Sequence, residues 1–124
     1  MIGQIVGGPR ARNANLTFEN GDTTGDLDDD LISDEIDIEG EGPMSVGCHF
    51  EWTTTDAVGP ITAEVNLAGA HWHPLDDLSV QVNGADGIDF VDIERLKASK
   101  LRFKFTRTAG TAGVLSGVYT VRHG

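Results

Sequence analysis

The stretch Met44-Ser-Val-Gly-Cys-His-Phe-Glu-Trp52 decides the fold class of this chain. Its apolar side chains occupy every second position, at Met44, Val46, Cys48, Phe50 and Trp52. Successive side chains of a strand point to opposite faces of its sheet, whereas an amphipathic helix repeats its apolar residues every three or four positions. The alternation therefore predicts a β-strand with one face in the core, while its polar residues face solvent.

The same period of two recurs later in the chain. Residues 61–67 place Ile61, Ala63, Val65 and Leu67 at alternate positions. The intervening Val58-Gly59-Pro60 is expected to connect this strand to the first one as an antiparallel hairpin. Residues 101–106 alternate in the same way, and the glycine-rich turn Ala109-Gly-Thr-Ala-Gly113 predicts a second hairpin with a last strand at 114–121.

Shorter strands are expected at 14–18, from Ile36 onward, at 78–82 and at 88–93, with the tight-turn dipeptides Asn83-Gly84 and Asp86-Gly87 between the last two. About eight strands with polar outer faces predict an all-β, two-sheet antiparallel β-sandwich, of which the jelly roll is one form. The residues expected to form its core are Met44, Val46, Phe50, Trp52, Val65, Leu67, Leu101, Phe103 and Phe105.

A length of 124 residues fits a single domain. Residues 1–15 have no sustained periodicity and are interpreted as an extended N-terminal arm, followed by a β-sandwich domain at 16–124. The arm has too few apolar residues to form a core of its own, so we expect it to bind a neighbouring chain. The residues expected to make this contact are Ile2, Ile5, Val6, Arg10 and Arg12.

The chain carries 20 acidic and 9 basic residues, a formal net charge of -11. Phosphate backbones and anionic membranes would be repelled, which excludes nucleic acid and membrane as expected partners. The charges are unevenly placed, because residues 19–41 hold many carboxylates and no lysine or arginine, whereas basic residues gather between Arg95 and Arg107. We expect this basic stretch to meet the acidic segment of its own or another copy, or to lie in solvent.

We expect no enzymatic activity and no cofactor. Nucleophilic catalysis needs a nucleophile beside a positioned base. No serine lies in a Gly-x-Ser-x-Gly motif, and the single cysteine, Cys48, is expected to point inward while its neighbour His49 points outward.

Two patterns raise the question of a metal. His71 and His73 have a spacing that metals use, but no third ligand accompanies them. Asp26, Asp28 and Asp30 match the first ligands of an EF-hand, yet Leu31 stands where that loop requires glycine. We therefore predict no metal site, with a solvated acidic loop at 22–37 favoured over a simpler calcium site there.

Trp52, Trp72 and Tyr119 are candidates for the aromatic platform of a carbohydrate-binding β-sandwich. The alternation assigns Trp52 to the core. Trp72 lies near a strand end, where either a surface role or a role capping the core fits it.

The layout Phe50-Glu-Trp52, Ala70-His-Trp72 and Leu101-Arg-Phe-Lys-Phe-Thr106, followed by the turn Ala109–Gly113, resembles small β-sandwich proteins encoded among the structural genes of tailed viruses. The resemblance covers residues 37–124. It implies a virion structural protein, foremost a capsid decoration or cement protein that binds the major capsid protein and forms homo-oligomers.

The alternatives are a tail, neck or baseplate component and a carbohydrate-binding attachment module. The first residues lack the basic and apolar regions of a signal peptide, so we expect synthesis in the host cytoplasm and a final location in the virion.

Overall fold

The computed structural model describes residues 11–38, 44–67, 71–96 and 98–123, and nearly all of its regular structure is extended. The elements in chain order are β1 (Ala11–Asn15), η1 (Glu19–Gly21), β2 (Thr24–Asp26), β3 (Leu31–Ile32), β4 (Ile36–Asp37), β5 (Met44–Thr53), β6 (Val58–Asn66), β7 (Trp72–Asn83), β8 (Gly87–Leu96), β9 (Lys100–Phe105) and β10 (Val114–His123). Within these ranges, no helix is long and apolar enough to cross a membrane.

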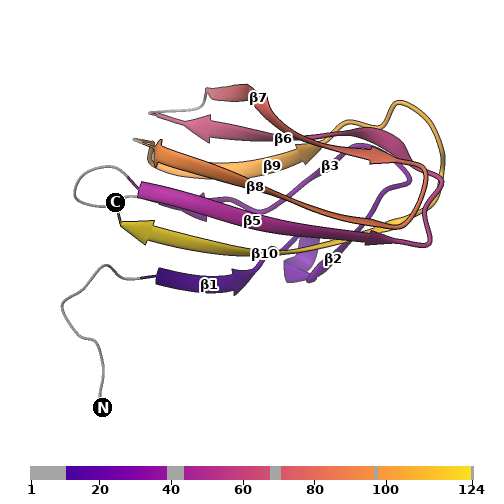
Figure 1. Ribbon diagram of the computed structural model, residues 1–124, viewed down its shortest axis with the longest axis horizontal. Coiled ribbons are helices and arrows are strands. Elements are labelled where there is room, and N and C mark those ends of the chain that lie inside the picture. The colour runs from indigo at the N-terminus through magenta and orange to yellow at the C-terminus, as the bar shows by residue number, and fades with distance from the viewer. Residues whose placement is uncertain (1–10, 39–43, 68–70, 97, 124) are drawn as a thin grey trace, which may run out of the picture.

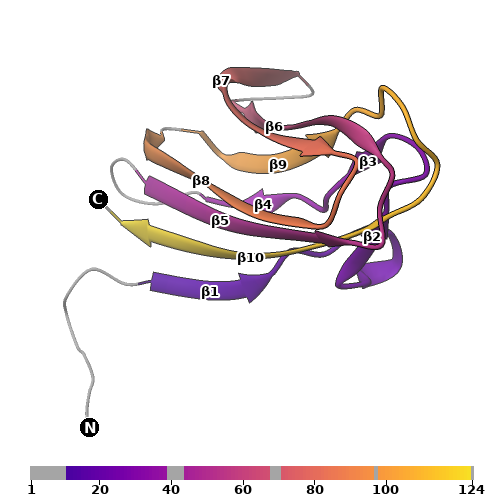
Figure 2. The same cartoon turned by 45° about the vertical axis from the view of Figure 1, so that its right-hand side comes forward.

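The strands form two antiparallel sheets that pack face to face (Figure 1 and Figure 2). The first sheet, here called the β5 sheet, has the order β1-β10-β5-β8, and β2 also pairs with β10. The second sheet, here called the β6 sheet, has the order β3-β9-β6-β7, and β4 also pairs with β9. The predicted two-sheet antiparallel β-sandwich is thus confirmed.

The path of the chain between the two sheets is that of a jelly roll. From β5 onward, the chain crosses to the other sheet for β6 and β7, returns for β8, crosses again for β9 and returns for β10. Of the long strands that follow one another in the described chain, only β6 and β7 are hydrogen-bonded neighbours. Paired strands therefore come mostly from distant parts of the sequence, as in a double Greek key.

Both predicted hairpins are wrong. β5 pairs with β10 and β8 rather than with β6, and residues 58–60, expected to be a connection, belong to β6 itself. β9 pairs with β6 rather than with β10. The physical reason is that alternation shows which face of a strand is buried, and both sheets bury their faces in the same core, so it does not identify the neighbouring strand.

The N-terminal segment is only partly described. Residues 11–15, assigned above to the arm, form β1 and pair with β10 from Ala11 opposite Arg122 to Asn15 opposite Val118. The expected strand at 14–18 therefore begins and ends earlier, although the Leu16 N–H still donates to the Gly117 carbonyl at 2.7 Å. Residues 1–10, and with them Ile2, Ile5, Val6 and Arg10, lie outside the described residues.

The core lies between the two sheets. All of the predicted core residues except Leu67 are buried, and Val46, Phe50 and Leu101 have no exposed surface. Leu67 is 55% exposed, because β6 ends at Asn66 and the alternation no longer applies beyond it.

The acidic segment 22–37 is less fully a loop than predicted. It contributes β2, β3 and β4, and Leu27 and Ile36 are buried in the core.

Candidate functional site

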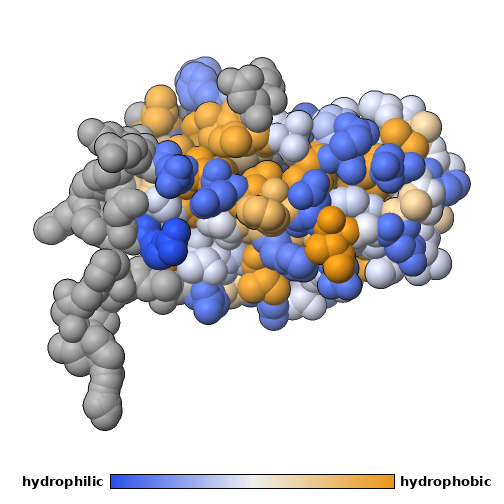
Figure 3. Space-filling view, viewed as in Figure 1, coloured by the Kyte–Doolittle hydropathy of each residue, from blue (hydrophilic) through white to orange (hydrophobic). Residues whose placement is uncertain are grey.

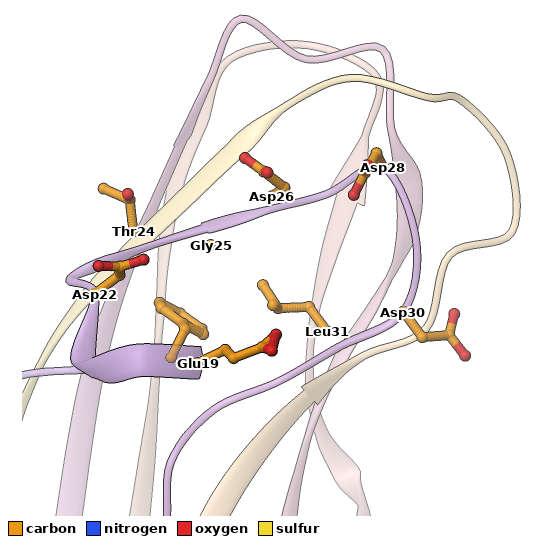
Figure 4. Close-up of a pocket in the computed structure, with 9 residues that line it drawn as sticks. Glu19, Asp22, Thr24, Gly25, Asp26, Asp28, Asp30 and Leu31 are labelled. Atoms are coloured by element: carbon orange, nitrogen blue, oxygen red, sulfur yellow. The ribbon is translucent and has the colours of Figure 1, made fainter.

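An open hollow of about 350 Å³ lies beside η1 and the segment that carries β2 and β3 (Figure 4). The turn at its base is held by backbone hydrogen bonds, since the Phe18 N–H donates to the Asp22 carbonyl at 2.8 Å and the Gly21 N–H donates to the Phe18 carbonyl at 2.9 Å. The lining combines two apolar side chains with several carboxylates and small residues: Phe18, Glu19, Asp22, Thr24, Gly25, Asp26, Asp28, Asp30 and Leu31.

The carboxylates around this hollow do not converge on one point. Figure 4 shows Asp22 and Asp30 at opposite ends of the segment, with the Asp30 carboxylate directed away from the others. One oxygen of Asp30 accepts the backbone N–H of Arg107 at 2.8 Å, which ties the segment to the end of β9. Across the described parts of the chain, the side chains of histidine, cysteine, aspartate and glutamate form no group of three or more that could hold a metal ion.

The other polar residues singled out by the sequence lie apart from the hollow. His71 and His73 are exposed at the start of β7. Cys48 is buried in β5, and this burial raises the pKa of its thiol to about 12. The thiol therefore stays protonated at neutral pH, while exposed His49 points to the opposite face of the strand.

Trp72 takes part in a cluster on the outer face of the β6 sheet. The guanidinium of Arg102 lies 4.1 Å from the centre of the Trp72 ring, and the Arg102 Nε–H donates to a carboxylate oxygen of Glu64 at 2.8 Å. The register places Arg102 opposite Glu64, and Trp72 opposite Asn66. Glu64 thus positions Arg102 over the indole, and the arginine covers one face of the ring.

The structure does not bring the three candidate aromatic side chains together. Trp52 is 4% exposed, as its place in the core alternation predicts. Tyr119 packs against the core from β10, and Trp72 lies on the outer face of the other sheet. A platform for stacking a sugar would have to consist of the half-buried Trp72 alone.

The outer face of the β5 sheet exposes large apolar side chains. We define the apolar patch as Ile88 and Phe90 of β8 with Val118 of β10, which are 64%, 67% and 46% exposed. His49 of β5 lies between Phe90 and Val118, because the register places it opposite both. Figure 3 shows hydrophobic residues interleaved with hydrophilic ones over β8, β5 and β10.

The apolar patch is not among the sites expected from the sequence, although a signal for it exists. Residues 88–93 place apolar side chains on both faces of β8, with Val91 and Ile93 buried and Ile88 and Phe90 exposed. A strand with one face in solvent would carry polar residues at positions 88 and 90. Large exposed apolar side chains that lie close together on one sheet face are typical of interaction surfaces.

Of the residues expected to bind a partner, Arg12 alone falls within the described chain. It lies in β1, where it pairs with Val121 of β10.

Among the described residues, the basic stretch meets the acidic segment of its own chain through an ion pair between the Lys100 ammonium and a Glu35 carboxylate oxygen at 3.6 Å.

No protein-family model matches the chain, and no curated protein matches its sequence. Among solved structures, the SPBc2 prophage-derived protein YomS is similar, with a TM-score of 0.57 and 9% identity over 96% of this chain and 99% of that chain. The VP2 subviral particle of infectious bursal disease virus is also similar, with a TM-score of 0.58 and 11% identity over 92% of this chain. This chain spans 32% of that viral chain. At such identities the likeness is one of fold: the β-sandwich of this chain also occurs in a prophage-derived protein and in a viral particle.

Proposed function

We propose that this chain is a structural protein of a tailed-virus particle, a capsid decoration protein that binds the major capsid protein and has no catalytic role. The observation that carries the proposal is the match of its fold, over nearly the whole of both chains, to a prophage-derived protein. The likeness to a subviral particle supports the same assignment. Its location would be the virion, after synthesis in the host cytoplasm.

Two features of the described surface support a role in assembly. The apolar patch presents Phe90 and Ile88 to solvent on a flat sheet face, as expected for a surface that other proteins cover. The net charge of -11 opposes binding to nucleic acid, so attachment to the protein shell fits better than contact with the packaged genome.

We propose that the N-terminal arm, residues 1–15, binds the neighbouring virion protein. Ile2, Ile5 and Val6 would bury against that protein, and Arg10 and Arg12 would pair with its acidic groups. Residues 1–10 are followed directly by β1, which is hydrogen-bonded to β10. A pull on residues 1–10 would therefore act on the hydrogen bonds between β1 and β10.

The test is attachment of purified protein to particles that have been stripped of it. A variant lacking residues 1–10 retains β1 and should melt at the same temperature as the full chain, but it should bind stripped particles at least tenfold more weakly. An Arg10→Ala variant tests the charge of one arm residue separately, and it should also bind stripped particles more weakly than the full chain. Equal binding by the truncated and full chains would assign attachment to the sandwich surface instead.

Copy number tests the capsid location separately. A decoration protein approaches the number of major capsid subunits, whereas a tail, neck or baseplate component is far rarer. Densitometry of purified particles against the major capsid band distinguishes these locations, and a low copy number would contradict the decoration role. The absence of the chain from purified particles would overturn the virion assignment altogether.

A further inference from the structure

The apolar patch lies on two strands, β8 and β10, that flank β5, and the exposed His49 of β5 lies between its members. Val118 of β10 is opposite His49 of β5, and His49 is opposite Phe90 of β8. Ile88 lies one row further along β8, opposite Glu51. Neighbouring strands are about 4.8 Å apart and alternate residues along a strand about 7 Å apart, so these side chains are close enough for one partner surface to cover them together.

Acidic side chains border the patch. Glu51 of β5 and Asp92 of β8 are exposed on the same face. If two copies joined patch to patch, these carboxylates would oppose one another, and like charges brought together at an interface are unfavourable. A matching surface must therefore combine apolar side chains with basic ones.

The opposite face of the same molecule has that chemistry. On β9, Lys100, Arg102 and Lys104 point outward, while Leu101 and Phe103 are buried. Lys104 is opposite Ile32 of β3, an apolar side chain that is 43% exposed.

The basic groups of β9 differ in how far they are already engaged. Lys100 is paired with Glu35, and Arg102 with Glu64. Within the described part of the chain, Lys104 has no ion-pair partner. Lys104 and Ile32 thus offer a basic and an apolar side chain next to each other.

We propose that the apolar patch of one molecule binds the β9 face of a second copy of this chain. The carboxylates around Phe90 then meet Lys104 and its neighbours, and Phe90 and Ile88 are covered by a surface that includes Ile32. The two surfaces lie on opposite sides of the sandwich, so the contact is head to tail, and it generates a ring or an open filament rather than a closed two-fold dimer. This self-association does not depend on the proposed virion role.

The full chain should associate in a concentration-dependent way in sedimentation velocity, from micromolar to millimolar protein. High sodium chloride should weaken the association, because salt screens pairs of exposed charges. Phe90→Ser removes the central anchor of the patch, and Lys104→Glu reverses the charge of the β9 face. Each variant should associate at least tenfold more weakly, as expected when a central contact of an interface is lost.

Leu67→Ser is the matched control, because Leu67 is 55% exposed and lies just beyond the end of β6, five residues from Thr62, which is the residue opposite Lys104. Its association should equal that of the unchanged chain. Thermal unfolding of every variant tests whether it is folded. Ile88→Ser, at a second exposed position of the patch, replaces Phe90→Ser if that variant does not fold.

Mixing the two variants tests the head-to-tail geometry. The Phe90→Ser chain retains an intact β9 face and the Lys104→Glu chain an intact patch, so an equimolar mixture should form dimers but nothing larger. If Lys104→Glu alone still associates and only Phe90→Ser does not, the patch pairs with itself and the proposal is wrong. A full chain that stays monomeric up to millimolar concentration overturns it as well.

Discussion

The ring of Phe50 in β5 meets the ring of Phe103 in β9 edge to face, with centroids 5.0 Å apart and planes at 83°. This geometry places the positive edge of one ring on the negative face of the other. Phe50 is fully buried and Phe103 is 3% exposed. Because β5 and β9 belong to different sheets, the contact joins the two layers of the sandwich through side chains alone.

Replacing Phe103 with alanine should lower the free energy of unfolding by about 3–5 kcal/mol, because it removes this ring contact and leaves a cavity between the sheets. Denaturant unfolding of dilute protein measures the change. Lys104→Ala is the matched control on the same strand, and its effect should stay within about 0.5 kcal/mol since the side chain points outward. A larger loss for Lys104→Ala than for Phe103→Ala would mean that the faces of β9 are reversed.

Replacing Gly87 with alanine should destabilise the fold by about 1–3 kcal/mol through overpacking. Gly87 is opposite Trp52, and an added methyl group would lie 2.7 Å from the indole Cζ2. Gly47→Ala in β5 is the control, because a methyl group there meets its nearest atom at 3.9 Å. Denaturant unfolding compares the two, and tryptophan fluorescence should change for Gly87→Ala alone. Equal stability of both variants would contradict the close packing of Trp52 on Gly87.

Asp56 should stabilise the loop between β9 and β10 in a pH-dependent way. Its carboxylate accepts the N–H groups of Thr111 at 2.9 Å and Ala112 at 2.8 Å, and these bonds lower its pKa from the ordinary 3.8. A lowered folded pKa means that the contribution is present above the unfolded pKa and is lost as the pH falls through the folded value.

Asp56→Ala should therefore be less stable than the unchanged chain at neutral pH, and the difference should shrink toward about pH 2. Chemical denaturation at the two pH values measures this. Asp56→Asn keeps an acceptor oxygen but does not titrate, which separates the geometry from the charge. A difference for Asp56→Ala that stays constant between these pH values would show that the carboxylate charge plays no part.

Glu64→Gln should cost about 1–2 kcal/mol, because it weakens a charge-assisted hydrogen bond to Arg102 in a pair whose side chains are 22% and 14% exposed. Trp72 fluorescence should also change as the guanidinium above it becomes less fixed. Glu35→Gln is the control, since the Lys100–Glu35 pair is 44% and 51% exposed and should contribute less than about 1 kcal/mol. Equal effects of the two substitutions would argue against a special role for the Trp72 cluster.

Calcium should not raise the melting temperature, because the carboxylates beside η1 do not point to a common centre (Figure 4). Thermal unfolding in calcium chloride and in excess chelator tests this, with magnesium chloride at equal ionic strength as the control for screening. A saturable rise with calcium alone would reveal a site within residues 22–37.

The sequence predicts the inward faces of the strands well and their partners poorly. Phe50 and Phe103 were both expected in the core, because burial of one face forces the alternation of apolar and polar residues. Backbone hydrogen bonds carry no comparable signal, so nothing in 44–52 distinguishes a partner at 61–67 from one at 114–121. Leu67 was wrongly expected in the core, since an apolar residue just past a strand end continues the pattern without being buried.

The apolar patch was missed for a different reason. Residues 88–93 carry apolar side chains on both faces of the expected strand, but the sequence does not show which of the two faces lies outside. Only the register with β5 and β10 shows that Ile88 and Phe90 gather with Val118. The sequence does not predict the Trp72 cluster either. Glu64, Trp72 and Arg102 come from three different strands, and the alternation does not reveal the order of these strands in the sheet.

The central place of β10 in the β5 sheet bears on how the chain folds as it is synthesised. β10 is hydrogen-bonded to β1, β2 and β5, yet all three precede it in the sequence and leave the ribosome before it. Until β10 has been made, β1 and β2 lack the strand to which they are hydrogen-bonded, and β5 has one unpaired edge. The nascent chain therefore exposes strand edges that favour aggregation. Folding must therefore be completed after synthesis of residues 114–123, and the distant strand pairings make it slow. Abundant synthesis of such a chain would therefore depend on chaperones that protect these edges until β10 has formed.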